Sequence, residues 1–482
     1  MKTTLFDLEH ARNTNNPETR KRLTGRSVAV IPLGCAKAQV DAEQMLGALA
    51  SAGYRIVHNP KKAEAVVINT CGFIQAAKDE SLRTIFESLK LKETHGVQTV
   101  AITGCLAERY AKELAEDIPE ADIVLPWSQE NELVHRLDAS LDIHRAEEPW
   151  CGERILLSPA HWAYLRISEG CNHRCAFCSI PAIRGKHISV PLEDLVAETE
   201  RLAARGVREV NVVAQDTTLW GVDLDGKPSL PLLLRSISRV PGIRWVRLLY
   251  THPAHVTDEL VRTFAESEVV VPYLDMPIQH INDVILKRMN RIVGRTQIER
   301  IISQFRANIP QMVLRTTVIV GLPYETEKRF RELLDFVEET KFDRLGCFVF
   351  SPEEGTEAAR MRNRVPQSVA AERQAIIMEA QRAISRKRNK ARVGKEYEIL
   401  TERRTGSSAI ARSYAEAPEV DGVIRVRGAH LPAPGEWSRV RITKAFDYDL
   451  LAAPAGNRPE HAGEPVSVER IPVSHGLARS CR

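Results

Sequence analysis

The sequence predicts an α/β protein with three folded parts: an N-terminal parallel-sheet α/β domain, a central partial (β/α)6 barrel and a small C-terminal β-barrel. Apolar runs alternate with helix-like stretches through most of the chain, which is typical of βα units. The 482 residues exceed what one hydrophobic core usually supports. The last folded stretch changes to short alternating strands between Gly and Pro turns, the pattern of a small barrel.

Composition and charge are those of a soluble globular protein. Hydrophobic residues make up 43% of the chain and charged residues 27%. The net charge of +4 is too small to indicate a general nucleic-acid binder. No uninterrupted apolar run reaches the roughly 18 to 20 residues of a membrane helix, and the N-terminus has no signal-like run. We therefore expect a cytoplasmic protein without a membrane partner. Nine cysteines, an odd number in a long chain, do not suit a secreted disulfide scaffold.

The N-terminal domain is expected over residues 27–145, after a mobile extension at 1–26. It contains one pattern three times, an apolar run that ends in a cysteine, at Cys35, Cys71 and Cys105. The spacings of 36 and 34 residues suit a strand followed by a crossover helix. Parallel strands end at one edge of their sheet, where open α/β sheets bind ligands. We therefore expect the three cysteines to converge at that edge.

The central domain is expected over residues 155–390, including a trailing helix. Six apolar runs separated by helical stretches predict six βα units, whereas a complete barrel of this kind has eight. We therefore expect an open, partial barrel with its chemistry on the loops after the strands. Those strand ends are polar, although each residue taken singly suits a turn or a cap; they are Gln215, Asp216, Thr251, His252, Gln279, His280, Gly321 and Ser351.

The remaining chain is predicted to form a β-barrel over residues 393–455 and a disordered, Pro-rich tail over 456–482.

A loop after the first barrel strand contains Cys171, Cys175 and Cys178 in a C-x3-C-x2-C arrangement. Three thiolates on one short loop suit a metal cluster. Structural zinc prefers four ligands, and His173 or His187 would complete a Cys3His site, so zinc stays open as an alternative. A 4Fe-4S cluster held by three cysteines leaves one iron without a protein ligand.

This loop resembles the signature of the radical S-adenosylmethionine (SAM) enzymes. In that family the open iron binds SAM, and an electron passed into the cluster releases a 5'-deoxyadenosyl radical, while the protein positions the radical. The resemblance implies that Phe177 lies near the adenine. It also makes Gln215, Gln279 and His280 the candidates for contacts with the cofactor. Loop packing or bracing is the alternative role for each of the four.

The similarity extends over nearly all of residues 27 to 452 and is closest to the methylthiotransferases of this family. Segments that carry it include PLGCAKAQVDAE, EGCNHRCAFCSIPAIRG and VPYLDMPIQHINDVILKRMNR. It implies a second, auxiliary 4Fe-4S cluster on Cys35, Cys71 and Cys105, and a TRAM domain as the final β-barrel. One departure is Tyr324, where the family usually has a small residue, and we expect it to narrow the loop on the cofactor side.

Within the methylthiotransferases, the sequence most resembles enzymes that modify ribosomal protein uS12. This implies that one SAM methylates a sulfur held on the auxiliary cluster. A second SAM would yield the radical that removes hydrogen from the β-carbon of an aspartate, which then takes up the methylated sulfur. The implied partners are uS12 or the small ribosomal subunit, a low-potential electron donor and a sulfur donor.

Two alternatives stay open. A sister enzyme methylthiolates N6-isopentenyladenosine in tRNA, but residues 393–452 carry nine bases and nine acids. Because an RNA-binding domain should be clearly basic, we expect a protein partner and no specific nucleic acid. A non-catalytic iron-sulfur carrier normally closes each cluster with four cysteines, so three ligands per cluster speak against it. Cys151, Cys347 and Cys481 are assigned to no metal.

Overall fold

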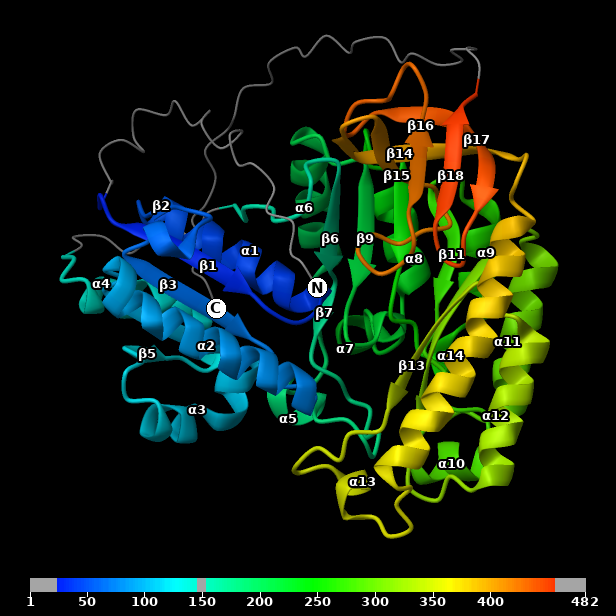
Figure 1. Ribbon diagram of the computed structural model, residues 1–482, viewed down its shortest axis with the longest axis horizontal. Helices are drawn as coiled ribbons and strands as arrows, with labels where there is room; N and C mark the ends of the chain where they lie inside the picture. Colours follow the sequence, from blue (N-terminus) through cyan, green and yellow to red (C-terminus); the bar gives the residue numbers. More distant parts are fainter. Residues whose placement is uncertain (1–23, 145–152, 456–482) are drawn as a thin grey trace.

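The computed structural model describes residues 24–144 and 153–455 (Figure 1). The predicted tail at 456–482, almost all of the predicted extension at 1–26, and Cys151 and Cys481 lie outside these residues. The predicted fold class is confirmed, with a parallel α/β domain, a partial barrel and a small closed β-barrel. The boundaries of the three domains stay predictions. Within the described ranges no helix combines the length and the apolar character that spanning a bilayer requires.

The N-terminal domain is a parallel five-stranded sheet in the order β2-β1-β3-β4-β5. Helices α1 and α4 cover one face and α2 and α3 the other, each over its own hydrophobic core. The central strands β3 and β4 are buried along their whole length, which explains their continuous apolar runs. The strands are β1 (Ser27–Pro32), β2 (Arg55–Ile56), β3 (Ala65–Thr70), β4 (Thr99–Gly104) and β5 (Ile123–Val124), and the helices are α1 (Ala36–Ser51), α2 (Gln75–His95), α3 (Cys105–Asp117) and α4 (Leu133–Ser140).

The central domain is an open sheet of six parallel strands in chain order, as the six apolar runs predict. Helices α6, α8, α9, α11 and α12 follow successive strands, and α14 packs along β13 (Figure 1). The strands are β6 (Trp162–Arg166), β9 (Glu209–Val213), β10 (Trp245–Leu248), β11 (Val270–Asp275), β12 (Val313–Val320) and β13 (Arg344–Val349). The helices are α6 (Leu192–Ala204), α8 (Leu230–Ser238), α9 (Asp258–Glu266), α10 (Asp283–Arg288), α11 (Arg295–Asn308), α12 (Glu327–Thr340), α13 (Glu357–Arg360) and α14 (Gln367–Lys390).

The C-terminal domain is a closed barrel in the order β14-β15-β16-β18-β17. Its loop from β15 to β16 packs into the inner face of the partial barrel, where Ala415 and Ala417 join the aromatic side chains of several barrel strands. Glu209 on β9 pairs in this interface with Arg412 at 2.7 Å and with Arg247 at 3.0 Å, all three nearly fully buried. The strands are β14 (Glu396–Thr405), β15 (Ser408–Arg412), β16 (Ile424–Arg427), β17 (Trp437–Ala445) and β18 (Leu450–Pro454).

The charges of this C-terminal domain are divided between its two sides. Acidic side chains point into the interface with the partial barrel, where Glu416 accepts hydrogen bonds from Arg344 at 3.0 Å and from Ser413 at 2.6 Å. Seven bases but only three acids are exposed. The totals are equal, as counted from the sequence, but the exposed residues of the domain are net basic. The exposed bases are Lys395, Arg404, Arg425, Arg427, Arg439, Arg441 and Lys444, and the exposed acids are Glu396, Glu419 and Glu436.

Candidate functional site

The structure brings the three cysteines of the N-terminal domain together at one sheet edge. Cys35 follows β1, Cys71 follows β3 and Cys105 follows β4, and these three strands are neighbours. Gly34 has a φ of +106°, and a Cβ there would lie 3.2 Å from the sulfur of Cys71. A glycine therefore lets the loop that carries Cys35 lie against Cys71. Two of the three cysteines also lie at helix N-termini, with Cys35 directly before α1 and Cys105 as the first residue of α3.

The second set of cysteines lies on a loop closed by a short antiparallel pair, β7 (Ser168–Glu169) and β8 (Ile188–Ser189). The amide of Cys171 donates to the carbonyl of Gly185 at 3.1 Å, and that of Cys178 donates to the carbonyl of Cys175 at 3.0 Å. The loop continues directly into the short helix α5 (Ile180–Arg184). The three sulfurs thus come from one compact turn beside the carboxyl end of β6.

The cysteines suit a metal cluster. Burial raises the pKa of Cys105 and of Cys178 to about 12 and that of Cys171 to about 11. Thiolates bind metals, so such thiols lose their protons when a metal binds. Among the described residues, one group of His, Cys, Asp or Glu side chains has its possible metal-ligand atoms all within 4.8 Å of one another. That group contains no cysteine. Neither set of sulfurs, as the side chains lie, is therefore gathered within that distance around a single point for one ion.

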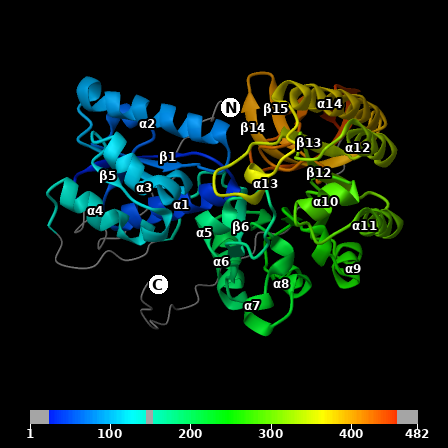
Figure 2. The same cartoon turned by 90° about the horizontal axis from the view of Figure 1, so that it is seen from below.

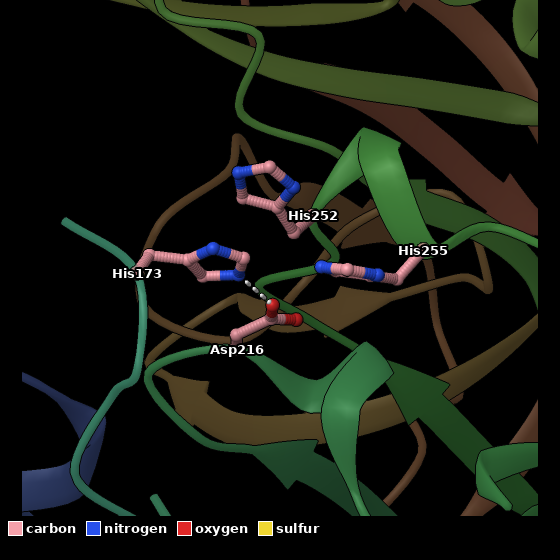
Figure 3. Close-up of side chains that lie close together, drawn as sticks. All are labelled: His173, Asp216, His252 and His255. Carbon is pink, nitrogen blue, oxygen red and sulfur yellow. Dashed lines mark hydrogen bonds and ion pairs between the residues drawn. The ribbon is translucent and has the colours of Figure 1, made fainter. Parts of the chain in front are cut away.

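That single group is His173, Asp216, His252 and His255, which gather above the ends of β9 and β10 (Figure 3). Nε2 of His173 lies 2.6 Å from a carboxylate oxygen of Asp216. The rings of His173 and His252 stack with centroids 4.1 Å apart and planes 16° apart. Nearly parallel rings direct their in-plane lone pairs side by side, so they do not converge on one ion.

This group instead fastens the cysteine loop to the barrel. Burial opposes the charge of Asp216, but hydrogen bonds from His173 and Thr218 lower the pKa of Asp216 below its usual range. Burial, helped by the charge of Arg291, lowers the pKa of His252, which is therefore neutral. His173 is thus occupied by Asp216, and Nε2 of His187 lies 3.1 Å from the hydroxyl of Ser189. Neither histidine lies in a group with the cysteines whose ligand atoms are all within 4.8 Å of one another, so the zinc site considered from the sequence is not assembled among the described residues.

Arg184 joins the two cysteine sites. It follows Cys178 by six residues, and its Nε and Nη2 atoms lie 3.3 and 3.1 Å from the sulfur of Cys105. The same guanidinium pairs with Asp41 at 2.8 Å and with Glu169 at 3.0 Å. Burial opposes its charge, but Asp41 and the neighbouring anions raise the pKa of Arg184 further. Hydrogen bonds to ligand sulfurs are among the factors that set the potential of an iron-sulfur cluster.

Three family models match the chain. They are the Uncharacterized protein family UPF0004 over residues 27–126, the Radical SAM superfamily over 165–337 and the TRAM domain over 393–454. The ribosomal protein uS12 methylthiotransferase RimO of Thermoanaerobacter sp. (strain X514) is 43% identical over 88% of this chain and 99% of its own length. That of Symbiobacterium thermophilum is 41% identical over 96% of this chain and 98% of its own. The chain belongs to the RimO family.

Solved structures support the fold of this RimO family member. The radical S-adenosylmethionine methyltransferase TsrM from Kitasatospora setae, with cobalamin and a [4Fe-4S] cluster bound, superposes with a TM-score of 0.51. The match is 13% identical and covers 69% of this chain and 74% of that one. At this identity the likeness concerns the fold alone.

The four residues predicted to contact the cofactor occupy different settings. Phe177 is half-buried against a hydrophobic cluster that includes Leu322 and Phe350. Gln215 is half-buried after β9, and no hydrogen bond joins it to another described side chain or backbone group. Gln279 has a φ of +69°, and its Oε1 is buried without a partner among the described residues, so it keeps an acceptor for a ligand.

His280, the fourth, is fully buried. Its Nδ1 accepts hydrogen bonds from the amides of Ile281 at 2.9 Å and of Asn282 at 3.0 Å. Burial, together with the charges of Arg373 and Arg329, lowers the pKa of His280 to about 3. These contacts suit a bracing role. The Nε2 atom of His280 is nevertheless buried without a hydrogen-bond partner among the described residues, as Oε1 of Gln279 is, so a cofactor contact stays open for it too. Contacts of all four residues with a cofactor stay predictions.

Tyr324, the departure from the RimO family pattern, adopts a φ of +67°. This left-handed conformation favours glycine, which explains a small residue at the position. The guanidinium of Arg288 lies 3.7 Å from the centre of the tyrosine ring. The ring packs on the same hydrophobic cluster as Phe177, and the narrowing of the loop on the cofactor side stays a prediction.

Charged residues inside the protein were not predicted from the sequence. Arg184, Arg291 and Lys37 contact or adjoin the cysteines, yet a single charged residue in a loop or helix gives no sequence signal of burial. The IPAIRG segment directly after Cys178 is the one feature that could have drawn attention to Arg184.

We expect each cysteine set to hold its own iron. Replacing Cys35, Cys71 and Cys105 together by Ala should remove about half of the iron that the wild-type chain takes up on anaerobic reconstitution. The triple variant at Cys171, Cys175 and Cys178 should lose the other half, because each set alone supplies three ligands. Iron and sulfide counting checks this. Full iron content in either variant would contradict two clusters, and the Cys347→Ala variant serves as the control.

We expect Arg184→Gln to weaken the auxiliary site selectively. Loss of an outer partner of a ligand commonly lowers metal affinity by about 10- to 100-fold. In a background that lacks Cys171, Cys175 and Cys178, the variant should therefore retain less iron under chelator challenge, and the potential of the remaining cluster should shift. Lys186→Gln, an exposed change in the same loop, is the control. Equal iron retention and equal potentials in both variants would rule this role out.

Proposed function

We propose that this protein is a radical SAM methylthiotransferase that adds a methylthio group to the β-carbon of an aspartate in ribosomal protein uS12. Relatives of that name are 41 to 43% identical over most of the chain. The observation that carries the proposal is the pair of three-cysteine sites linked through Arg184. When bound, SAM and the two 4Fe-4S clusters supply one-electron chemistry that can break an unactivated C–H bond and deliver a methylated sulfur.

In this proposal the protein's own residues hold the two sites at a fixed separation. Asp41 on α1 is almost fully buried and pairs with both Arg166 on β6 and Arg184. Cys35 lies one residue before α1, and Cys178 lies shortly before Arg184. Because one carboxylate binds both arginines, the auxiliary cysteines and the cysteine loop are tied to the same ion network.

The segment after β13 contacts both the N-terminal domain and the cysteine loop. The carboxylate of Glu353 accepts from the amide of Gln75 at 3.0 Å and from Lys78 at 2.8 Å. Five residues later, the amide of Ala358 donates to the carbonyl of Ala176 at 2.7 Å. The segment thereby covers part of the space beside the loop. Excluding water there protects a reactive intermediate from side reactions.

Lys37 is the cation that we assign to the substrate aspartate. Its side chain is 5% exposed, and its Nζ lies 3.5 Å from the centre of the Tyr250 ring at the end of β10. No carboxylate within the described ranges forms an ion pair with it. Burial opposes its charge, but Cys35 and other neighbouring groups raise the pKa of Lys37 above its usual range. A charged ammonium group that no described carboxylate contacts suits an anionic ligand at this point. Lys37 follows Cys35 by two residues, so a carboxylate bound to it would lie beside the auxiliary cysteines.

The remaining partners belong to the proposal as well. A sulfur donor must restore the sulfur that leaves with each product, and a low-potential donor must supply the electrons. Modification of uS12 or of the assembled small subunit places the reaction in the cytoplasm. The absence of a specific nucleic-acid partner stays a prediction.

The alternative substrate, N6-isopentenyladenosine in tRNA, is favoured by one observation. The outer face of the C-terminal barrel exposes seven bases and three acids, and such a face suits a phosphate backbone. The RNA of the small subunit could meet the same face, so the charge alone does not separate the two substrates.

We expect the reconstituted protein, given SAM and a reductant, to methylthiolate uS12 and to leave tRNA unmodified. Mass spectrometry of the digested uS12 should locate the group on one aspartate, and nucleoside analysis should find none in tRNA. The triple variant at Cys171, Cys175 and Cys178 is the control. Modification of tRNA alone would replace this proposal with the alternative.

We expect Lys37→Met to lower the kcat/KM for uS12 by roughly 30-fold or more, since removing one partner of a buried charge pair typically costs about 2–5 kcal/mol. The same substitution should have little effect on binding of a uS12 variant that carries Asn in place of the aspartate. Lys37→Arg should restore part of the activity, and the iron content should not change. An equal loss of binding for both forms of uS12 would show that Lys37 acts on the fold and not on the carboxylate.

A further inference from the structure

A net basic face lies beside the cysteine loop of the partial barrel. The three segments that form it carry two exposed acids, Asp283 and Glu357, of which Asp283 lines the cavity described below. They also carry six exposed cations, and no carboxylate in the described parts of the chain forms an ion pair with any of these cations. The cations come from the cysteine loop, from α10 and from α13 with the residues that follow it. They are Arg174, Lys287, Arg288, Arg360, Arg362 and Arg364.

Hydrogen bonds hold these three segments together. The amide of Ala176 in the cysteine loop donates to the carbonyl of Met289 at the end of α10 at 3.0 Å. The amide of Ala358 on α13 donates to the carbonyl of Ala176, and Asn290 donates to Glu357 at 2.8 Å. Figures 1 and 2 show α10 and α13 near each other at one end of the molecule. The cations therefore belong to one continuous surface.

One residue that lines this face contacts a cysteine of the loop. Nη1 of Arg291 lies 3.7 Å from the sulfur of Cys175, and its Nη2 donates to the carbonyl of Pro277 at 2.8 Å. A cavity of about 660 Å³ opens at the same place, and its lining includes Arg174, Lys287 and Arg291. A redox partner seated here would thus come close to the cysteine loop without entering the barrel.

Exposed apolar side chains lie among the cations. Ile292 is 64% exposed and borders the cavity, and Val284 on α10 is 42% exposed. Protein interfaces combine such apolar positions with a charged rim, whereas nucleic-acid interfaces are more uniformly polar. This combination favours a protein over an RNA backbone as the occupant of the face.

We infer that this surface docks an acidic one-electron carrier protein, which delivers the electrons that the proposed function needs. Complementary charge would steer the carrier to the face and raise its association rate. Each transfer oxidises the carrier by one electron and reduces the site at Cys171, Cys175 and Cys178 by one. The inference rests on the proposed function for its purpose, but docking itself can be measured without catalysis.

The test uses the full-length reconstituted protein and a purified bacterial flavodoxin, an acidic carrier, as the probe. The variant K287Q/R360Q/R362Q removes three exposed cations that lie outside the cysteine loop. We expect its Kd for oxidised flavodoxin at low salt to rise about tenfold or more. Formation of 5'-deoxyadenosine with reduced flavodoxin should fall by a similar factor and lose its salt dependence, while formation with dithionite should stay at the wild-type rate.

The matched control is R404Q/R427Q/R439Q, which removes three exposed cations of the C-terminal barrel that form no ion pair with any carboxylate in the described ranges. It should bind flavodoxin as the wild type does. Unchanged flavodoxin binding in the first variant, or equal losses in both variants, would overturn the inference. It would also be overturned if the first variant lost affinity for small ribosomal subunits only, which would make the face an RNA contact. Failure of dithionite to support SAM cleavage in wild-type protein would count against the proposed function, while the binding measurement would still decide the docking site.

Discussion

The arrangement of both cysteine sites depends on one buried carboxylate. Asp41 lies on the helix that starts beside Cys35, and it pairs with Arg166 on the first barrel strand and with Arg184 just beyond the cysteine loop. Burial opposes its charge, but the two guanidinium groups lower the pKa of Asp41 below its usual range. Removing one partner of such a pair commonly costs about 3–5 kcal/mol. The separation of the two sites is thus set by electrostatics in the interior more than by the loops that carry the sulfurs.

Much of this architecture could be predicted from the chain. The six apolar runs of the barrel all form strands, and three strand-end cysteines meet at one edge because their strands are neighbours in the sheet. The two-residue strands β2 and β5 were missed because pairing, and not an apolar pattern, creates them. Burial of Arg184 was also missed, since its partner Asp41 is 143 residues away in the sequence. A charge count gives the zero net charge of the C-terminal barrel correctly, but it cannot tell which acids the domain turns inward.

The two ends of the barrel take different tasks. The C-terminal barrel fills the inner face with apolar side chains and with the ion pairs of Glu209, and it leaves its basic residues outside. The opposite end holds the cysteine loop, the histidine group and the segment that runs from Glu353 to Ala358. Because the C-terminal barrel closes the inner face, the carboxyl ends of the strands remain available for chemistry. The active sites of β/α barrels lie at these strand ends.

Two sets of ion pairs between the N-terminal domain and the partial barrel restrict the movement of these domains relative to each other. Asp41 fastens the N-terminal domain to the barrel on one side, and Glu353 fastens it to the segment after β13 on the other, through Lys78 and Arg109. A hinge movement that separated the two domains would break the ion pairs of Asp41 and of Glu353 at the same time. Because these ion pairs hold the two domains in one relative position, a change of conformation during binding must come from the protein that is modified. The geometry therefore suits a substrate aspartate on a flexible, protruding loop.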